Sequence, residues 1–201
     1  MHRVFVSFYH RDDQRYKDAL VKWAKEHEVF IDGSVDIGDI PDEWNDHKIR
    51  ETIRDEYLRN TSVTILLVGP NTRHRKHVDW EIYSSMYDGK KNKRSGIIVV
   101  MLPETNCDGC HIPYANEKSQ IYPEITNWVK VDSRNEYEQR YPDMPERIID
   151  NLMAVGVKIS VTTWNKLTPS NLRMMIDNAY ENRLTQPYDL SREMRRKNGN
   201  C

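Results

Sequence analysis

A glutamate near the start of a predicted helix is the residue of this chain best placed to do chemistry. An apolar run at residues 63–68 ends at Gly69-Pro70, and a polar, basic loop leads into a helical pattern at about Val78–Tyr87 that carries Glu81. In an open parallel sheet, ligands bind in the crevice outside the carboxyl ends of the strands, where this loop and the first turn of this helix are expected to lie. Glu81 is therefore our leading candidate for a catalytic carboxylate.

Glu81 also has a purely structural explanation. An acidic residue in the first turn of a helix complements the helix dipole, which is a common use of glutamate. The expected inner face of this helix is formed by Val78, Ile82, Ser85 and Met86, and Glu81 lies beside that face. On periodicity alone we favour the dipole role.

Five potentially cationic residues, Arg73-His74-Arg75-Lys76-His77, lead into the same helix. Together with the free backbone N–H groups of a helix amino end, they could hold the phosphates of a nucleotide. The alternative is a solvated loop, which is the usual role of a run of charge. The chain has no Walker loop and no Gly-x-Gly-x-x-Gly sequence, so conventional ATP or dinucleotide-redox chemistry is disfavoured.

The aromatic residues divide into two groups. Tyr9, Trp44 and Trp80 fall at expected loop positions or off the apolar stripes, where they could stack on a planar ring. Trp23 and Trp164 lie within apolar patterns, and we expect them in the core.

The three cysteines, Cys107, Cys110 and Cys201, are an odd number and too few for a disulfide framework, which agrees with a reducing compartment. Cys107-Asp-Gly-Cys110-His111 matches the spacing used for covalent haem attachment and for half of a zinc site. There is no second cysteine pair for zinc, and no export signal for a haem protein. We therefore expect no metal and no bound cofactor, and interpret the two cysteines either as part of an irregular loop or as a weakly redox-sensitive pair.

The overall charge excludes some partners. The 201 residues carry 30 Lys and Arg against 31 Asp and Glu, a net charge of −1, which provides no general attraction to nucleic acid or to an anionic membrane. No apolar run approaches the roughly 20 residues of a membrane span. We expect a soluble, cytoplasmic protein.

The order of the expected elements predicts an α/β fold. Strands are expected at residues 3–8, 29–32, 63–68 and 96–102, with helices after the first three and a weak fifth strand at residues 128–131. This alternation requires a parallel sheet with helices on both faces. We predict a flavodoxin-like three-layer sandwich with strand order 2-1-3-4-5, in which Asp12 or Asp13 caps the first helix.

The C-terminal third is expected to be a helical addition to this core. Helical patterns begin near Pro145 and at Thr168-Pro169, and residues 158–163 form a short β-branched stretch between them. We therefore divide the chain into a domain of residues 1–132 and a helical extension of residues 133–201 packed on it. Residues 192–201 are strongly charged, and we expect them to be frayed.

Several ordered motifs resemble the TIR domain family. Residues 4–13 (VFVSFYHRDD) look like its first conserved box, and residues 29–39 (VFIDGSVDIGD) resemble its second strand and the long loop that follows. Residues 77–82 (HVDWEI) look like the helix box that supplies the catalytic glutamate of NAD-cleaving TIR proteins, with His77 where those proteins have tryptophan. Over about residues 1–132, the chain is most similar to the TIR-like signalling component of the bacterial Thoeris anti-phage defence system.

This resemblance implies an NAD+ nucleosidase or ADP-ribosyl cyclase that breaks the bond between nicotinamide and ribose. NAD+ would be the substrate, and Glu81 would hold the ribose hydroxyls and stabilise the oxocarbenium ion that develops. The pyrophosphate would be held by Arg73 or Arg75. The expected substrate-binding residues are Ser7, Phe8, Tyr9, His10, Asp36, Arg73, His77 and Trp80.

The resemblance also implies partners. In Thoeris-like systems ADP-ribose is cyclised into a diffusible messenger for a partner effector, and self-association through TIR-like surfaces is expected. Two alternatives stay open. The chain could be a non-catalytic interaction module that uses residues 33–45, or another enzyme acting on N-glycosidic bonds, such as a nucleoside deoxyribosyltransferase.

Overall fold

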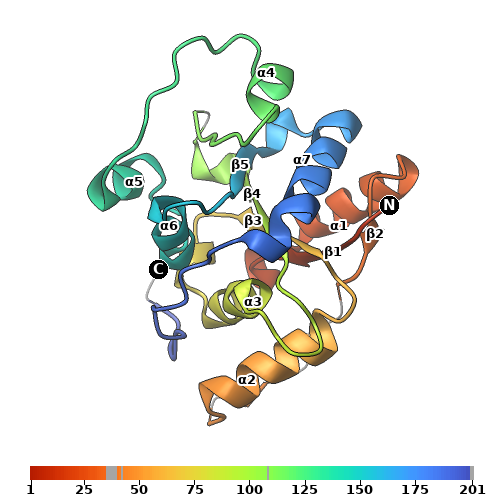
Figure 1. Cartoon of the computed structure of the whole chain (residues 1–201), viewed down its shortest axis with the longest axis vertical. Helices are drawn as coiled ribbons and strands as arrows, with labels where there is room; N and C mark the ends of the chain where they lie inside the picture. Colours follow the sequence, from red (N-terminus) through yellow and green to blue (C-terminus); the bar gives the residue numbers. More distant parts are fainter. Residues whose placement is uncertain (35–39, 42, 108, 200–201) are drawn as a thin grey trace.

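The computed structural model describes residues 1–34, 40–41, 43–107 and 109–199, and it is built around one parallel sheet (Figure 1). The strand order is β2-β1-β3-β4-β5, and every neighbouring pair is parallel. This confirms the flavodoxin-like order 2-1-3-4-5. The strands are β1 (Arg3–Ser7), β2 (Ile31–Asp32), β3 (Val63–Val68), β4 (Gly96–Met101) and β5 (Ser160–Thr163).

The two central strands explain why the sheet could be predicted. Every residue of β3 and β4 is buried, as expected of strands that are covered by helices on both faces. Alternate residues of β1 face opposite sides, because Val4 and Val6 belong to one apolar cluster and Phe5 to another.

The fifth strand was predicted in the wrong place. Residues 128–131 form no strand, and Val129 is 68% exposed. The edge position is taken by β5, which pairs with β4 from Ser160 to Thr163 and also bridges Ile112 through Val161. The sheet thus takes its last strand from beyond residue 132, and the division of the chain at that residue stays a prediction.

Helices cover both faces of the sheet. Buried side chains of α1 and α7 pack on the face that carries Val4 and Ile65, whereas α3 and α6 cover the face that carries Leu66. A third apolar cluster joins α2 and α3 to Phe5. The helices are α1 (His10–Glu26), α2 (Asp46–Thr52), α3 (Lys76–Met86), α4 (Glu117–Ile121), α5 (Arg134–Arg140), α6 (Glu146–Met153) and α7 (Pro169–Asn182), and a π-helical turn at Ile53–Tyr57 follows α2.

The start of α1 differs from the prediction. The helix begins at His10 and its cap residue is Tyr9, which makes no side-chain capping bond. Asp12 and Asp13 therefore lie inside the first turn, where acidic residues complement the helix dipole. Asp13 is buried instead of capping the helix from solvent.

The last part of the chain is packed against the domain, contrary to the expectation of a frayed end. We call residues 187–199 the C-terminal segment, which Figure 1 shows in dark blue beside α3 and α6. Met194 is 3% exposed in the cluster shared by α2 and α3, and Tyr188 donates a hydrogen bond to the carbonyl of Ser95 (3.1 Å). In the described ranges, no helix is long and apolar enough to cross a membrane.

Candidate active site

The crevice outside the carboxyl ends of β1 and β3 is the expected position for a ligand in this fold. The chain reverses direction across the sheet between these two strands, and α3 runs back from this edge. Ser7 is the last residue of β1, and it lies in register with Leu66 of β3. Side chains from Ser7, from the loop after β3 and from the start of α3 therefore meet at the same place.

Glu81 and Ser7 form the centre of this site. Ser7 Oγ donates a hydrogen bond of 2.5 Å to Glu81 Oε2, although the two residues are 74 positions apart in the sequence. Glu81 is 2% exposed, and Ser7 is fully buried. Burial raises the pKa of Glu81 from 4.5 to about 8, while the hydrogen bond from Ser7 acts in the opposite direction.

The dipole explanation of Glu81 does not fit this geometry. Because α3 begins at Lys76, Glu81 lies in the second turn rather than the first, and its side chain faces the sheet rather than solvent. A buried carboxyl with a raised pKa at the end of a sheet strand is typical of functional sites. Its burial was not predicted, because the periodicity placed Glu81 beside the inner face of the helix.

The raised pKa of Glu81 predicts a specific pH dependence of stability. Between pH 4.5 and about pH 8 the folded protein keeps a proton on Glu81 that the unfolded chain releases. The free energy of unfolding should therefore fall as the pH rises, by up to about 1.4 kcal/mol per pH unit from this group. Urea unfolding of the wild type and of Glu81→Gln across this range should show a steeper fall in the wild type than in the variant. Equal slopes would contradict the assignment.

Asp13 is a second buried carboxyl at the same edge, and the sequence analysis did not select it. Thr72 Oγ1 donates to Asp13 Oδ2 (3.2 Å) and accepts a hydrogen bond from the backbone N–H of Gly69 (2.9 Å). A β-carbon on Gly69 would lie 2.6 Å from Asp13 Oδ1, so only glycine fits there without a shift. Burial raises the pKa of Asp13 to about 6. This chain of contacts fixes the loop after β3 against the start of α1.

The residues after β1 have different environments. Phe8 is buried in the core, and its ring stacks on that of His10 at 4.3 Å. Tyr9 is half-buried, and the guanidinium of Arg75 lies 4.1 Å from its ring centroid. Tyr9, His10 and Arg75 thus lie at the edge of the crevice, and Phe8 packs beneath them in the core.

His77 and Trp80, the two aromatic residues of the segment that resembles the TIR helix box, have different environments. His77 is exposed, and its ring meets the edge of the Trp80 ring at 5.0 Å. Trp80 is 1% exposed within the cluster of Phe5, and its Nε1–H donates to the carbonyl of Arg195 (2.8 Å). Trp80 is therefore a core residue under the C-terminal segment, and the expectation that it offers an open ring face to a substrate was wrong.

The basic run is divided between several environments. Arg73 extends towards α6, where it donates to the carbonyl of Pro142 and lies 3.8 Å from Glu146. Arg75 instead reaches over Tyr9, so it is the arginine of this run that borders the residues after β1. Asp36, the expected contribution of the long loop, falls outside the described residues.

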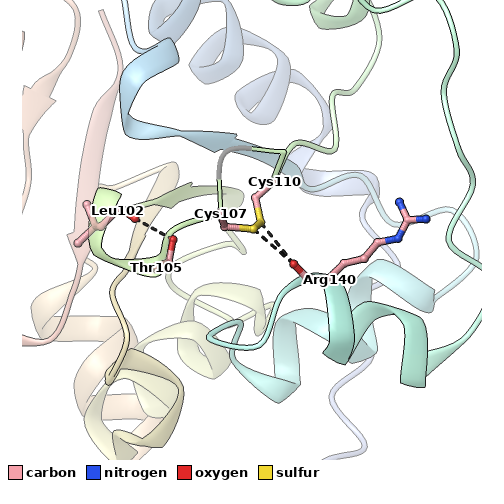
Figure 2. The surroundings of a disulfide bond; sticks show 5 residues. All are labelled: Leu102, Thr105, Cys107, Cys110 and Arg140. Atoms are coloured by element: carbon pink, nitrogen blue, oxygen red, sulfur yellow. Dashed lines mark hydrogen bonds between the residues drawn. A yellow bond between two sulfur atoms is a disulfide. The ribbon is translucent and has the colours of Figure 1, made fainter.

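Cys107 and Cys110 form a disulfide, which the sequence analysis did not predict (Figure 2). Figure 2 shows both sulfur atoms directed at the carbonyl oxygen of Arg140, at 3.4 Å from Cys107 Sγ and 3.6 Å from Cys110 Sγ. The pair joins the loop after β4 to the end of α5. Among the described residues, no group of three or more His, Cys, Asp or Glu side chains could hold a metal ion.

The sequence and the fold both resemble those of known proteins. A family model described as "Thoeris protein ThsB, TIR-like domain" matches residues 5–107, just over half of the chain. A search of the curated proteins found no match. Among solved structures, the chain is similar to the TIR domains of the activated Roq1 resistosome directly recognizing the pathogen effector XopQ, with 13% sequence identity and a TM-score of 0.35.

That similarity covers 51% of this chain and 58% of the resistosome chain, so the chain spans less than two thirds of the length of that relative. The family assignment depends on the match to the family model, and the observed strand order agrees with it. The chain belongs to the TIR-like domain family of the Thoeris protein ThsB.

Proposed function

We propose that this protein cleaves the nicotinamide–ribose bond of NAD+ and that Glu81 is its catalytic carboxylate. The observation that carries the proposal is the buried Glu81–Ser7 pair at the carboxyl end of β1, beside the switch point of the sheet. Membership of the ThsB TIR-like family supports the same substrate class.

The chemistry suits a single carboxylate. The nicotinamide of NAD+ is a cationic pyridinium that leaves as a neutral molecule, so its departure needs no general acid. Positive charge develops on the ribose, and an ionised Glu81 would stabilise it as the carboxylates of glycosidases do. Ser7, which already donates to Glu81 Oε2, would fix the orientation of the carboxylate.

The protonation of Glu81 couples substrate binding to activation. In the enclosed site the carboxyl is mainly neutral at pH 7, because its pKa is about 8. A cationic nicotinamide ring nearby would favour the ionised form and lower this pKa. Substrate binding would thus generate the charged carboxylate that the reaction uses.

Access to Glu81 requires an opening movement, because the residue is 2% exposed. The C-terminal segment joins α3 to the start of α2, since Trp80 Nε1 donates to the carbonyl of Arg195 and Arg196 Nη1 donates to the carbonyl of Trp44 (2.8 Å each). We propose that these elements separate when NAD+ enters between them.

The remaining site residues keep the roles that the resemblance implies. Tyr9, His10 and Arg75 would border the substrate, and His77 would lie at the outer end of the crevice. Phe8 would support the rim. The product would be an ADP-ribose derivative, cyclised into a diffusible messenger for an effector protein, and the enzyme would assemble through TIR-like surfaces.

Substrate competition tests this proposal against the nearest enzymatic alternative. The full chain, with extract from phage-infected cells as a trigger, is incubated with NAD+ or with deoxynucleosides and a free base, and products are identified by mass spectrometry. We expect free nicotinamide from NAD+ and no base exchange. Base exchange without nicotinamide release would indicate a deoxyribosyltransferase, and no turnover of either substrate would indicate an interaction module.

A further inference from the structure

A small cavity beside the start of α3 is lined by arginines from three parts of the chain. Its volume is about 150 Å³, and it lies between the loop after β3, the first turn of α3, the start of α6 and the C-terminal segment. Arg73 comes from the loop, Arg75 from the cap of α3, and Arg192 and Arg195 from the C-terminal segment.

Arg73 and Arg195 are only partly neutralised. Arg192 donates to both oxygens of Asp150 and also lies 2.9 Å from Glu146, so its charge is balanced. Arg73 and Arg195 each approach Glu146 at 3.8 Å, which exceeds hydrogen-bond length. These two guanidinium groups therefore share a carboxylate that is already bonded to Arg192.

One hydrogen-bond donor among the residues that line the cavity is buried and has no acceptor. Among the described residues, the Nε–H of Arg73 is buried without a hydrogen-bond partner. A buried N–H without an acceptor is destabilising, which makes its presence beside a cavity informative. An acceptor inside the cavity would remove this cost.

Three acids line the cavity, Asp79, Glu146 and Glu193, and the first of them does not oppose the positive field of the arginines. Asp79 is bonded by both arms of the buried Arg147, at 2.8 and 3.0 Å, so its charge is already neutralised from behind. The field is also felt by the neighbouring His74, whose pKa is lowered by burial and then by the charges of Arg73, Arg195 and Arg75.

We propose that this cavity binds a phosphate group, either free phosphate or one phosphate of a nucleotide. Arg73 and Arg195 would hold it from opposite sides, because guanidinium groups bind phosphate oxygens through two parallel N–H donors. The proposal goes beyond NAD+ cleavage and does not depend on it. Since the two arginines belong to the loop after β3 and to the C-terminal segment, a bound phosphate would tie that segment to α3.

Arg195→Gln is a clean variant for testing this site. The packing contacts of Arg195 are made by its backbone, whose N–H donates to Asp79 Oδ2 (2.8 Å) and whose carbonyl accepts from Trp80. Within the described part of the chain, the side chain forms one ion pair, with Glu146 at 3.8 Å. Arg59→Gln is the matched control, because Arg59 is exposed and precedes β3 at the opposite edge of the sheet.

Isothermal titration of inorganic phosphate into the full chain, against sodium chloride at equal ionic strength, measures binding. We expect saturable binding by the wild type, at least tenfold weaker binding by Arg195→Gln, and a change of less than about twofold for Arg59→Gln. No binding, or equal binding by wild type and Arg195→Gln, would overturn the proposal.

Two further arms identify the source of the phosphate and separate this site from the catalytic one. ADP binding at least tenfold tighter than inorganic phosphate, with both weakened by Arg195→Gln, would assign the cavity to a nucleotide, and similar affinities would assign it to free phosphate. Glu81→Gln should bind phosphate as the wild type does, whether or not NAD+ is cleaved. Loss of phosphate binding in Glu81→Gln would overturn the claim of a separate site.

Discussion

Glu81→Gln is expected to lower the rate of nicotinamide release from NAD+ by roughly 10³-fold or more. Losses on this scale follow when a group that stabilises charge in the transition state is removed. Glutamine matches glutamate in size, and its carbonyl oxygen can accept the hydrogen bond from Ser7 Oγ that Glu81 Oε2 now accepts. It carries no charge at any pH, so it cannot stabilise a cationic ribose. The fold should survive, because a neutral side chain suits this buried position.

The rate is measured from nicotinamide formation by chromatography, with thermal unfolding as the check on folding. Glu181→Gln is the matched control, because Glu181 is an exposed residue of α7. Ser7→Ala should cost less, about tenfold, since it removes the hydrogen bond that favours the ionised form of Glu81. A larger loss in Ser7→Ala than in Glu81→Gln would assign the main role to the serine.

Arg147→Met is expected to destabilise the protein by about 3–5 kcal/mol, as breaking a buried ion pair usually does. The Arg147 side chain is fully buried, and it bonds both oxygens of Asp79 on α3. It also donates to the carbonyls of Arg192 (2.9 Å) and Glu193 (3.0 Å) in the C-terminal segment. Methionine fills a similar space, but it leaves the two carbonyls without this donor and the Asp79 carboxylate with no cationic partner, bonded only by the backbone N–H of Arg195 among the contacts described above.

Urea unfolding at pH 7 measures this loss. Arg147→Lys should recover little of it, because an ammonium group cannot bond both Asp79 oxygens and both carbonyls in the geometry of a guanidinium. Arg140→Met is the control, since the Arg140 side chain makes a partly exposed pair with Glu136 at 2.8 Å and its loss should cost no more than about 1 kcal/mol. A similar small loss in Arg147→Met would mean that the C-terminal segment is held by other contacts.

The sheet was predictable because its signal is local. Residues 63–68 and 96–101 are continuous apolar runs, and such runs occur in parallel strands that are buried on both faces. The fifth strand was placed at residues 128–131, although residues 158–163 were recognised as a β-branched stretch. Ser160–Thr163 is short and largely polar, and its burial comes from pairing with β4 and from Tyr122, which shares a hydrogen bond of 2.8 Å with Thr162.

The site was predictable in part. The topology placed Ser7 and Glu81 at the same edge, and the expected inner face of α3 is buried as predicted. The burial of Glu81 was not predicted because α3 is covered on further sides as well, where Trp80, Glu81 and Ser84 are also buried. The role of Asp13 depends on its contact with Thr72, and no pattern within either segment indicates that contact.

The C-terminal segment shows a second limit of sequence reasoning. Its run of charged residues is typical of a solvated tail, yet several of its contacts use backbone groups, such as the carbonyl of Arg192 and the N–H of Arg195. Backbone contacts leave little trace in residue types. Their partners, Arg147 and Asp79, also lie on two different helices, so their pairing required the fold.

The pH dependence of NAD+ cleavage tests the central claim most directly. Nicotinamide release is measured at substrate concentrations below KM for the wild type and Glu81→Gln from pH 5 to pH 9, so that the rate reports the free enzyme. Because the carboxylate must be ionised and its pKa is about 8, we predict that the wild-type rate rises with pH towards that value, while the variant stays inactive throughout. Wild-type turnover by Glu81→Gln, or a wild-type rate that does not change across this range, would contradict the assignment of Glu81 as the catalytic carboxylate.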